Sequence, residues 1–244
     1  MKGTGSLPVI VGMATMPTRA GSLPLALENL LPQADRIYLY LDGHAEVPTI
    51  ARGNPRIIPL FCDRTPQVHS AGKFLGLLHK TSPCFYAGVD DDIVYPKDYL
   101  ATLRGALARA ELPTVVGYHG VVLHETVESY RRDRQVFAFK DALTEASPVD
   151  VLGSGTVMFL TADLKFDVTA WPETNITDLQ LAMEARRAGM AMRCLPRAAN
   201  YLQPIAVQQA DSIYTQLLKD DSRQTQLAQT LQALGRVRHY CGPA

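Results

Sequence analysis

Three consecutive carboxylates, Asp90, Asp91 and Asp92, follow directly on the apolar run Phe85–Val89. The run predicts a buried strand, and ligands of open α/β sheets bind at the carboxyl ends of strands. Three adjacent anions repel one another unless a cation neutralises them. Carboxylate oxygens suit Mg²⁺ or Mn²⁺, which also bind phosphate oxygens. Because side chains alternate along an extended chain, Asp90 and Asp92 are expected to share a metal–diphosphate site, with Asp91 on the other side. The alternative interpretation is a solvated acidic turn.

Three other features could contact a ligand. Lys73 precedes an apolar run and could reach a phosphate as a point charge, or it could be a solvated lysine at the start of a helix. His119 ends a predicted strand, where it would either line a substrate pocket or make a structural hydrogen bond. Gly153, Ser154 and Gly155 form a turn that lets a ligand approach the backbone closely. The alternative for this last feature is a plain tight turn.

The elements that must position these residues alternate along the chain. Strands are expected at residues 7–13, 36–41, 57–61, 85–89, 114–118, 149–152 and 156–160. Helices are expected behind Ser22 as an N-cap, over 97–111, over 177–187 and from 211 to about 237. Strands alternating with helices predict an α/β fold with a mostly parallel sheet and helices on both of its faces. The polar segment 120–141 is expected to be long and mobile.

The helix predicted over 177–187 begins with an acidic residue. Thr177 and Gln180 have the spacing of a capping box, and Gly189 suits the C-terminal cap. Asp178 would lie in the first turn, where a carboxylate also stabilises the helix dipole. Beyond the helix, Arg193 and Arg197 could meet a diphosphate or an anionic sugar, or lie on a solvated surface.

Composition excludes some functions. The 244 residues carry 24 basic and 24 acidic side chains, so the cationic excess typical of nucleic-acid binding is missing. The four cysteines, Cys62, Cys84, Cys194 and Cys241, have no metal-binding or disulfide spacing and indicate a reduced, cytoplasmic protein. No apolar run is long enough to span a membrane, and no targeting segment is expected.

The segment from Asp90 to Tyr99 resembles the DxD segment of glycosyltransferases with the GT-A fold. Further segments extend the resemblance in order and spacing: 17–19, 33–41, 72–74, 116–120, 136–139 and 152–157. Taken together, residues 8–202 resemble the bacterial α-N-acetylglucosaminyltransferases of heparosan capsule synthesis. The resemblance departs at residues 62–70, at Tyr201 and after Pro204, which leaves the identity of the acceptor open.

This resemblance implies a GT-A-like, Rossmann-like catalytic domain over residues 1–204, with a C-terminal helical extension over 205–244. The nucleotide-sugar half would span about 1–110 and the acceptor half about 111–204. The implied reaction moves a sugar, GlcNAc in the first place, from a UDP-sugar to an oligosaccharide or polysaccharide acceptor with Mn²⁺ or Mg²⁺. A second glycosyltransferase is a candidate partner, through which the protein would reach the inner membrane.

The resemblance also implies roles for individual residues. Pro17 and Arg19 would face the uridine, and Asp90 would lie near the ribose and the metal. Asp91 would belong to the nucleotide site, and Asp92 would coordinate Mn²⁺ and the diphosphate. Other implied positions are Lys73 at a phosphate, His119 in the substrate pocket, the turn of Gly153, Ser154 and Gly155 at the sugar or acceptor, and Asp178 at the acceptor hydroxyl.

Three alternatives stay open. The resemblance implies retention of configuration, but an inverting enzyme would use Asp178 as general base. A non-catalytic subunit could bind the nucleotide sugar within a synthase complex. A nucleotidyltransferase is disfavoured because no glycine-rich loop near the N-terminus could hold a triphosphate.

Overall fold

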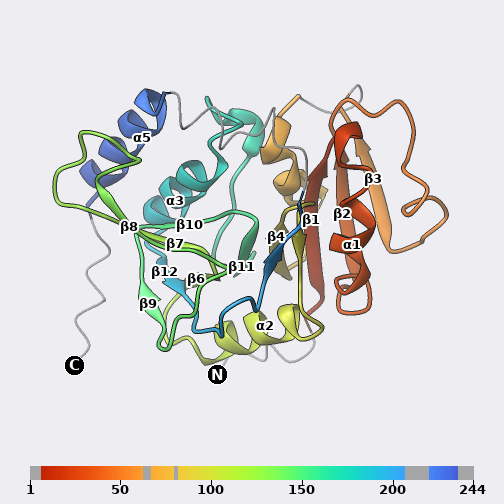
Figure 1. Ribbon diagram of the computed structural model, residues 1–244, viewed down its shortest axis with the longest axis horizontal. Coiled ribbons are helices and arrows are strands. Elements are labelled where there is room, and N and C mark those ends of the chain that lie inside the picture. The colour runs from red at the N-terminus through yellow and green to blue at the C-terminus, as the bar shows by residue number, and fades with distance from the viewer. Residues whose placement is uncertain (1–6, 63–66, 80–81, 207–219, 236–244) are drawn as a thin grey trace.

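The structure, a computed structural model, describes residues 7–62, 67–79, 82–206 and 220–235. Its centre is an eight-stranded mixed sheet with the order β3-β2-β1-β4-β11-β6-β12-β9 (Figure 1). Parallel pairing joins the first four strands, which are β3 (Ile57–Phe61), β2 (Arg36–Leu41), β1 (Val9–Thr15) and β4 (Phe85–Val89). The expected α/β fold with a mostly parallel sheet is therefore confirmed.

The other half of the sheet mixes strand directions. The antiparallel strand β11 (Thr156–Leu160) lies between β4 and β6 (Thr114–Gly117). Strand β12 (Ala191–Cys194) pairs with β6 in parallel. The last strand, β9 (Ser147–Pro148), pairs with β12 in the antiparallel direction. Because β11 runs against β4, the residues just before β11 lie beside the residues just after β4.

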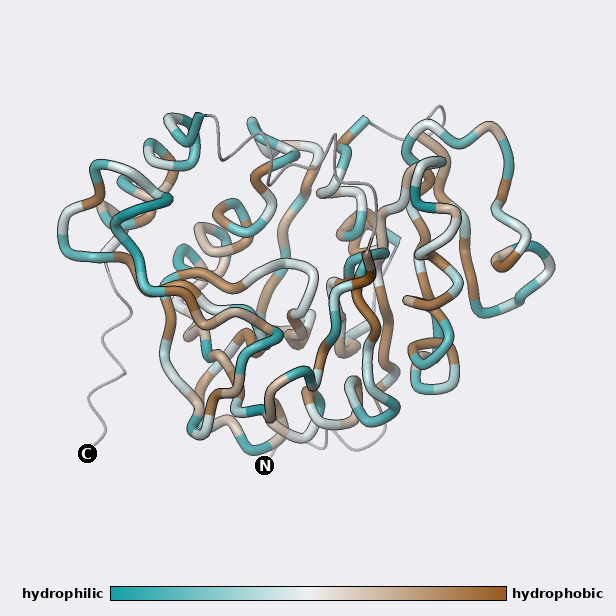
Figure 2. Tube along the Cα trace, in the orientation of Figure 1, coloured by the Kyte–Doolittle hydropathy of each residue, from teal (hydrophilic) through white to brown (hydrophobic). Residues whose placement is uncertain are grey.

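Alternation along the strands divides the core into two layers. In β1, Val9, Val11 and Met13 pack on one face, while Ile10 packs on the other. The first face is covered by α1 (Leu23–Glu28) and α2 (Tyr99–Arg109), and the second by the 3₁₀ helix η2 (His69–His79) and by α3 (Thr177–Arg187). Figure 2 shows hydrophobic residues along the central strands and hydrophilic ones along the outer loops. Helices thus lie on both faces, as expected.

The segment 120–141, expected to be mobile, instead forms two strands. The antiparallel pair β7 (Gly120–Leu123) and β8 (Arg134–Phe137) joins β10 (Val151–Leu152) in a three-stranded sheet. The prediction was wrong because Val121 and Leu123 are buried and because α5 (Ser222–Ala233) covers the loop between the strands. The remaining elements are η1 (Pro17–Arg19), η3 (Val168–Ala170) and the short pair β5 (Ile93–Val94) and β13 (Gln203–Pro204).

The two predicted N-terminal caps are wrong, and the C-terminal cap is confirmed. Ser22 precedes α1, but its hydroxyl donates to the carbonyl of Arg19 and caps nothing. Thr177 lies inside α3, where its hydroxyl pairs with that of Ser70 at 2.8 Å. Gly189 ends α3 with φ of 68°, its N–H donating to the carbonyl of Arg186.

Several other expectations are settled by the described residues. The helix expected over 97–111 is α2, and the expected tail helix contains α5, whereas 211–219 and 236–237 lie outside the described residues. Cys62, Cys84 and Cys194 are free thiols, and Cys241 lies outside the described residues. No helix in the described ranges is long and apolar enough to cross a membrane.

Candidate functional site

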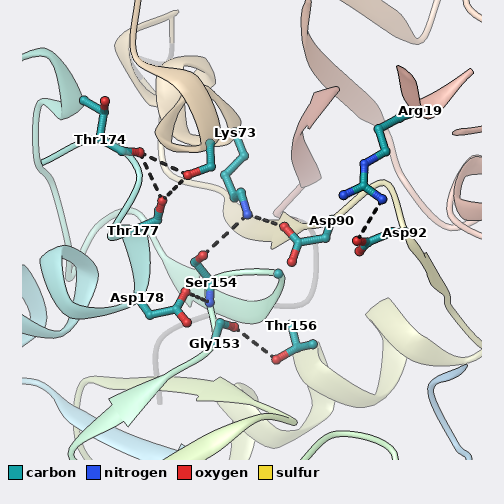
Figure 3. Close-up of polar contacts among 12 residues, drawn as sticks. Arg19, Lys73, Asp90, Asp92, Gly153, Ser154, Thr156, Thr174, Thr177 and Asp178 are labelled. Atoms are coloured by element: carbon teal, nitrogen blue, oxygen red, sulfur yellow. Dashed lines mark hydrogen bonds and ion pairs between the residues drawn. The ribbon is translucent and has the colours of Figure 1, made fainter. Parts of the chain in front are cut away.

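The candidate site lies where the ends of four strands and the first turn of a helix meet at one edge of the large sheet. Parallel strands β1 and β4 end there, leading into Arg19 and into the carboxylate triplet. Antiparallel β11 begins at the same edge, because Thr156 pairs with Val89, so the turn 153–155 lies beside the triplet. The end of β6 leads to His119, and the first turn of α3 adds Asp178. Figure 3 shows Arg19, Asp90, Asp92 and Asp178 converging from these elements.

Lys73 is buried at the centre of this arrangement. Its side chain is only 4% exposed, and its ammonium forms an ion pair with a carboxylate oxygen of Asp90. The hydroxyl of Ser154 lies 3.4 Å from the same nitrogen. Burial alone would lower the pKa of Lys73, but Asp90, with smaller contributions from Asp178 and Asp92, raises it above its ordinary value. The ammonium is therefore charged, and the interpretation as a solvated lysine is wrong.

A second ion pair holds Asp92. A guanidinium nitrogen (Nη1) of Arg19 lies 3.4 Å from Oδ2 of Asp92, with the two side chains 16% and 33% exposed. Burial and the charge of Asp90 raise the pKa of Asp92, whereas Arg19 and Lys73 lower it. The chain itself thus supplies two cations for two of the three carboxylates.

Asp91 is separated from the other two carboxylates, as the alternation predicts. It is 8% exposed, and its Oδ2 is buried without a hydrogen bond. Burial, with smaller contributions from the charges of Asp92 and Asp90, raises the pKa of Asp91 to about 7, while Thr15 and Arg19 oppose this shift. The structure therefore brings Asp90 and Asp92 to the partly open side and places Asp91 inside.

The turn 153–155 connects the triplet to Asp178. The N–H of Ser154 donates to Oδ1 of Asp178 at 2.8 Å. Tyr95 accepts a hydrogen bond from the N–H of Asp90 at 2.8 Å and donates to the carbonyl of Gly155 at 2.7 Å. Asp90 and Asp178 are therefore fixed to the same short turn. The sequence analysis missed Tyr95, although it lies within the segment 90–99 that carries the resemblance.

Gly155 has no side chain, and the carboxylate of Asp90 occupies the space that a side chain would fill. A Cβ atom at Gly155 would lie 1.9 Å from Oδ2 of Asp90, so any side chain there must displace that carboxylate.

We expect Gly155→Ala to lower the free energy of unfolding by about 1–3 kcal/mol, the usual cost of overpacking. Urea unfolding would measure the change. Gly105→Ala in α2, where the nearest atom is the end of the Arg109 side chain at 3.4 Å, should cost nothing; an equal loss in both variants would contradict the prediction.

The charges of Asp178 and Arg134 act on His119 in opposite directions. Its Nδ1 is buried without a hydrogen bond. Burial lowers the pKa of His119, and Arg134 and Arg197 lower it too, while Asp178 and Asp90 raise it. The backbone N–H of His119 donates to the Thr156 hydroxyl at 3.1 Å. His119 is thus a neutral imidazole beside the turn 153–155, with an unused ring nitrogen.

The remaining predicted residues divide between site and scaffold. Pro17 is exposed at the start of η1, and Gly153 packs against the His119 ring, which a Cβ atom would meet at 3.1 Å. The Arg197 guanidinium donates to the carbonyls of Ala138, Asp141 and Leu195, so it supports the loops and faces no ligand. Trp171 stacks on Phe166 and belongs to the core.

The two partly exposed carboxylates fit a hard divalent cation. Mg²⁺ is usually held by one or two carboxylates together with substrate phosphates and water, and Asp90 and Asp92 supply oxygen ligands that act on each other electrostatically. Within residues 7–62, 67–79, 82–206 and 220–235, no group of three or more His, Cys, Asp or Glu side chains could hold a metal alone. A cation at this site would therefore depend on the oxygens of a bound phosphate ligand.

Comparisons with known proteins add no family to this description. No protein-family model matches the chain, and no curated protein matches it significantly. The geometry at the sheet edge therefore carries the functional argument.

Proposed function

We propose that this protein is a metal-dependent glycosyltransferase that moves a sugar, with GlcNAc as the first candidate, from a UDP-sugar to a glycan acceptor. One observation carries the proposal. At the carboxyl end of β4, Asp90 and Asp92 are paired with Lys73 and Arg19, and the turn 153–155 joins them to Asp178. The ordered resemblance of residues 8–202 to capsule glucosaminyltransferases supports the same reaction.

The cations of the site suit a diphosphate. Lys73 and Arg19 already neutralise carboxylates, and both can share their donors with phosphate oxygens as a donor sugar binds. Asp90 and Asp92 would hold Mn²⁺ or Mg²⁺. The cation, when bound, supplies Lewis-acid stabilisation of the departing diphosphate, so the leaving group needs no proton. Because Lys73 is buried, its charge acts in a medium where electrostatic interactions are strong.

The acceptor side would be formed by Asp178 and His119. In the transfer, the bond between the sugar C1 and the phosphate oxygen breaks, and a bond from C1 to the acceptor oxygen forms. In a retaining reaction the acceptor proton passes to the departing phosphate, and the carboxylate of Asp178 orients the acceptor or stabilises the positive charge at C1. In an inverting reaction Asp178 takes that proton itself. The anomeric configuration of the product, measured by NMR, separates the two.

The proposed biological setting follows from the same resemblance. The glycan would be a bacterial polysaccharide such as a capsule, built in the cytoplasm. The protein would reach the inner membrane through partners, among them a second glycosyltransferase, and it would bind no nucleic acid.

The donor site is tested by calorimetric titration of UDP-GlcNAc into the protein with Mn²⁺ and again with EDTA. We expect binding that requires the cation, because Lys73 and Arg19 are already paired with Asp90 and Asp92, whose carboxylates would otherwise repel the diphosphate. Other UDP-sugars titrated in parallel identify the preferred sugar. The absence of binding for every nucleotide sugar in both conditions would refute the donor site.

Asp178→Asn separates the charge of this residue from its hydrogen bond. The Asn carbonyl can still accept the N–H of Ser154, which now donates to Oδ1 at 2.8 Å, so the turn should keep its shape. We expect kcat to fall by about 10²–10⁴-fold, the contribution of a positioned base or charge, while the Kd for the UDP-sugar stays within about twofold because no donor contact is lost. Glu184→Gln, farther along the same helix, is the control. Unchanged turnover in Asp178→Asn would remove this residue from the reaction.

A further inference from the structure

We infer that helix α5 is a positioning element for the acceptor side of the site. Through hydrogen bonds to the backbone of residues 124–133, the β7–β8 loop, it holds Tyr130 and Arg134 in place. The strands that this loop joins lead to the site, because β7 begins directly after His119 and pairs with β10, which runs into the turn 153–155. The inference rests on the proposed function for its kinetic consequence, while its structural part can be tested separately.

Polar side chains of α5 make the connection to the β7–β8 loop. The Thr225 hydroxyl accepts the N–H of Tyr130 at 2.9 Å. The Gln229 side-chain amide donates to the carbonyl of Val127 at 2.8 Å, and that of Gln232 donates to the carbonyl of His124 at 2.7 Å. Because Thr225, Gln229 and Gln232 are spaced four and three residues apart, their side chains lie on one face of the helix. One face of α5 thus satisfies the backbone of the loop along its length.

The residue before α5 extends the connection. The carboxylate of Asp221 accepts the Ser129 hydroxyl at 2.6 Å and the N–H of Arg131 at 2.9 Å. Both bonds hold the pKa of Asp221 below its ordinary value. In Figure 1, α5 lies beside α3 and the β7–β8 loop, at the edge of the molecule farthest from β3.

Apolar packing holds α5 itself against the body of the protein. Among the residues of α5, Thr225, Ala228 and Leu231 are buried, and Ala228 and Leu231 belong to the core cluster that includes residues of α3. A cavity of about 240 Å³ lies at its C-terminal end, lined in part by Leu123, Arg186 and Leu231. The polar bonds add the contacts to the backbone of the loop.

Two residues connect the β7–β8 loop to the site: Tyr130 in the loop and Arg134, the first residue of β8. Tyr130 is 5% exposed, and the guanidinium of Arg134 lies over its ring, 4.2 Å from the centroid. The Arg134 charge lowers the pKa of His119, and the Asp178 charge raises the pKa of Tyr130. These four side chains therefore act on one another electrostatically across the acceptor side.

Arg134 also has donor capacity to spare. Its Nε is buried without a hydrogen bond, and none of the ion pairs among the described residues includes it. A planar guanidinium held over an aromatic ring presents its donors in fixed directions. In this position it would orient oxygens of the acceptor glycan, and α5 would keep it there.

The test is the double variant Thr225→Val/Gln229→Leu, which removes two bonds to the loop and keeps side-chain size. Arg223→Gln is the matched control, because the Arg223 guanidinium lies on the same helix but pairs with Glu173 and Gln226. We expect faster hydrogen exchange of the amides of Tyr130 and its neighbours, and a higher pKa of His119 by NMR as Arg134 withdraws. The KM for the acceptor should rise about tenfold, since misplaced groups lose orientation, with the Kd for the UDP-sugar unchanged.

The outcomes show whether α5 positions the residues of the acceptor side or only binds to the β7–β8 loop. Faster exchange with an unchanged His119 pKa and an unchanged acceptor KM would overturn the inference, as would equal effects in Arg223→Gln. If the unaltered protein transfers no sugar, the proposed function fails, but amide exchange and the His119 pKa still test whether α5 positions these residues. Should the double variant fail to fold, Thr225→Val alone removes the acceptor of the Tyr130 amide and is judged by the same measurements.

Discussion

If the protein is the glycosyltransferase proposed above, Asp92→Asn is expected to reduce the transfer rate by at least about 10³-fold, because the cation that would stabilise the diphosphate would lose one of its two carboxylate ligands. The substitution keeps the shape of the side chain, so the fold should be retained. It also leaves Arg19, now 3.4 Å from Oδ2 of Asp92, without its charged partner. The measurements are turnover with UDP-GlcNAc and calorimetric titration of UDP in the presence of Mn²⁺. We expect the variant to lose both the turnover and the binding.

The control for this substitution is Asp98→Asn. Asp98 belongs to the same segment but precedes α2, where it accepts the hydroxyl of Tyr201 at 3.1 Å, a bond that Asn can keep. We expect Asp98→Asn to keep full turnover and metal-dependent binding. If Asp92→Asn behaves like this control, the site assignment at the end of β4 is wrong.

Asp90→Ala is expected to destabilise the protein more than Lys73→Met, although the two residues form one ion pair. Removing Asp90 leaves an ammonium that is only 4% exposed without its carboxylate partner. Breaking a fully buried pair costs about 3–5 kcal/mol, and because Asp90 itself is 38% exposed we expect about 2 kcal/mol here. In Lys73→Met the buried position becomes apolar, and the carboxylate that remains is partly solvated, so the loss should stay below about 1 kcal/mol.

A double-mutant cycle tests the pair directly. Urea unfolding of Asp90→Ala, Lys73→Met and the combined variant gives the coupling energy between the two sites. The combined variant should recover most of the stability lost in Asp90→Ala, because no buried charge remains. Equal stability of Asp90→Ala and the unaltered protein would show that Lys73 does not depend on Asp90. All three variants should lose donor binding, so stability and binding are separated within one experiment.

Elements with a strong local hydrophobic pattern could be predicted from the sequence. The bounds of β2, β3, β4, β11 and α3 agree with the predicted ranges, because continuous apolar runs and helical periodicity are local properties. The carboxylate triplet was placed at a strand end for the same reason. The separation of Asp91 from Asp90 and Asp92 also followed from local alternation.

Features that depend on distant partners were predicted poorly. Thr177 has the local pattern of a cap, yet its hydroxyl pairs with Ser70, 107 positions away. The polar composition of 120–141 indicated mobility, but Tyr130 is held by Thr225, 95 positions away. Lys73 resembles a solvated lysine locally, and only the approach of Asp90 and Ser154 makes its burial favourable.

The sequence by itself determined the α/β class, the strands of the parallel half and the acidic triplet after β4, since each follows from neighbouring residues. Only the tertiary structure decided that β11 runs antiparallel between β4 and β6, and therefore that the turn 153–155 and Asp178 lie beside the triplet. It alone decided that Lys73 and Arg19 pair with Asp90 and Asp92. The physical reason is that strand periodicity specifies which face is buried but not which strand lies alongside, and a charge is stable inside a protein only where a distant residue supplies its partner.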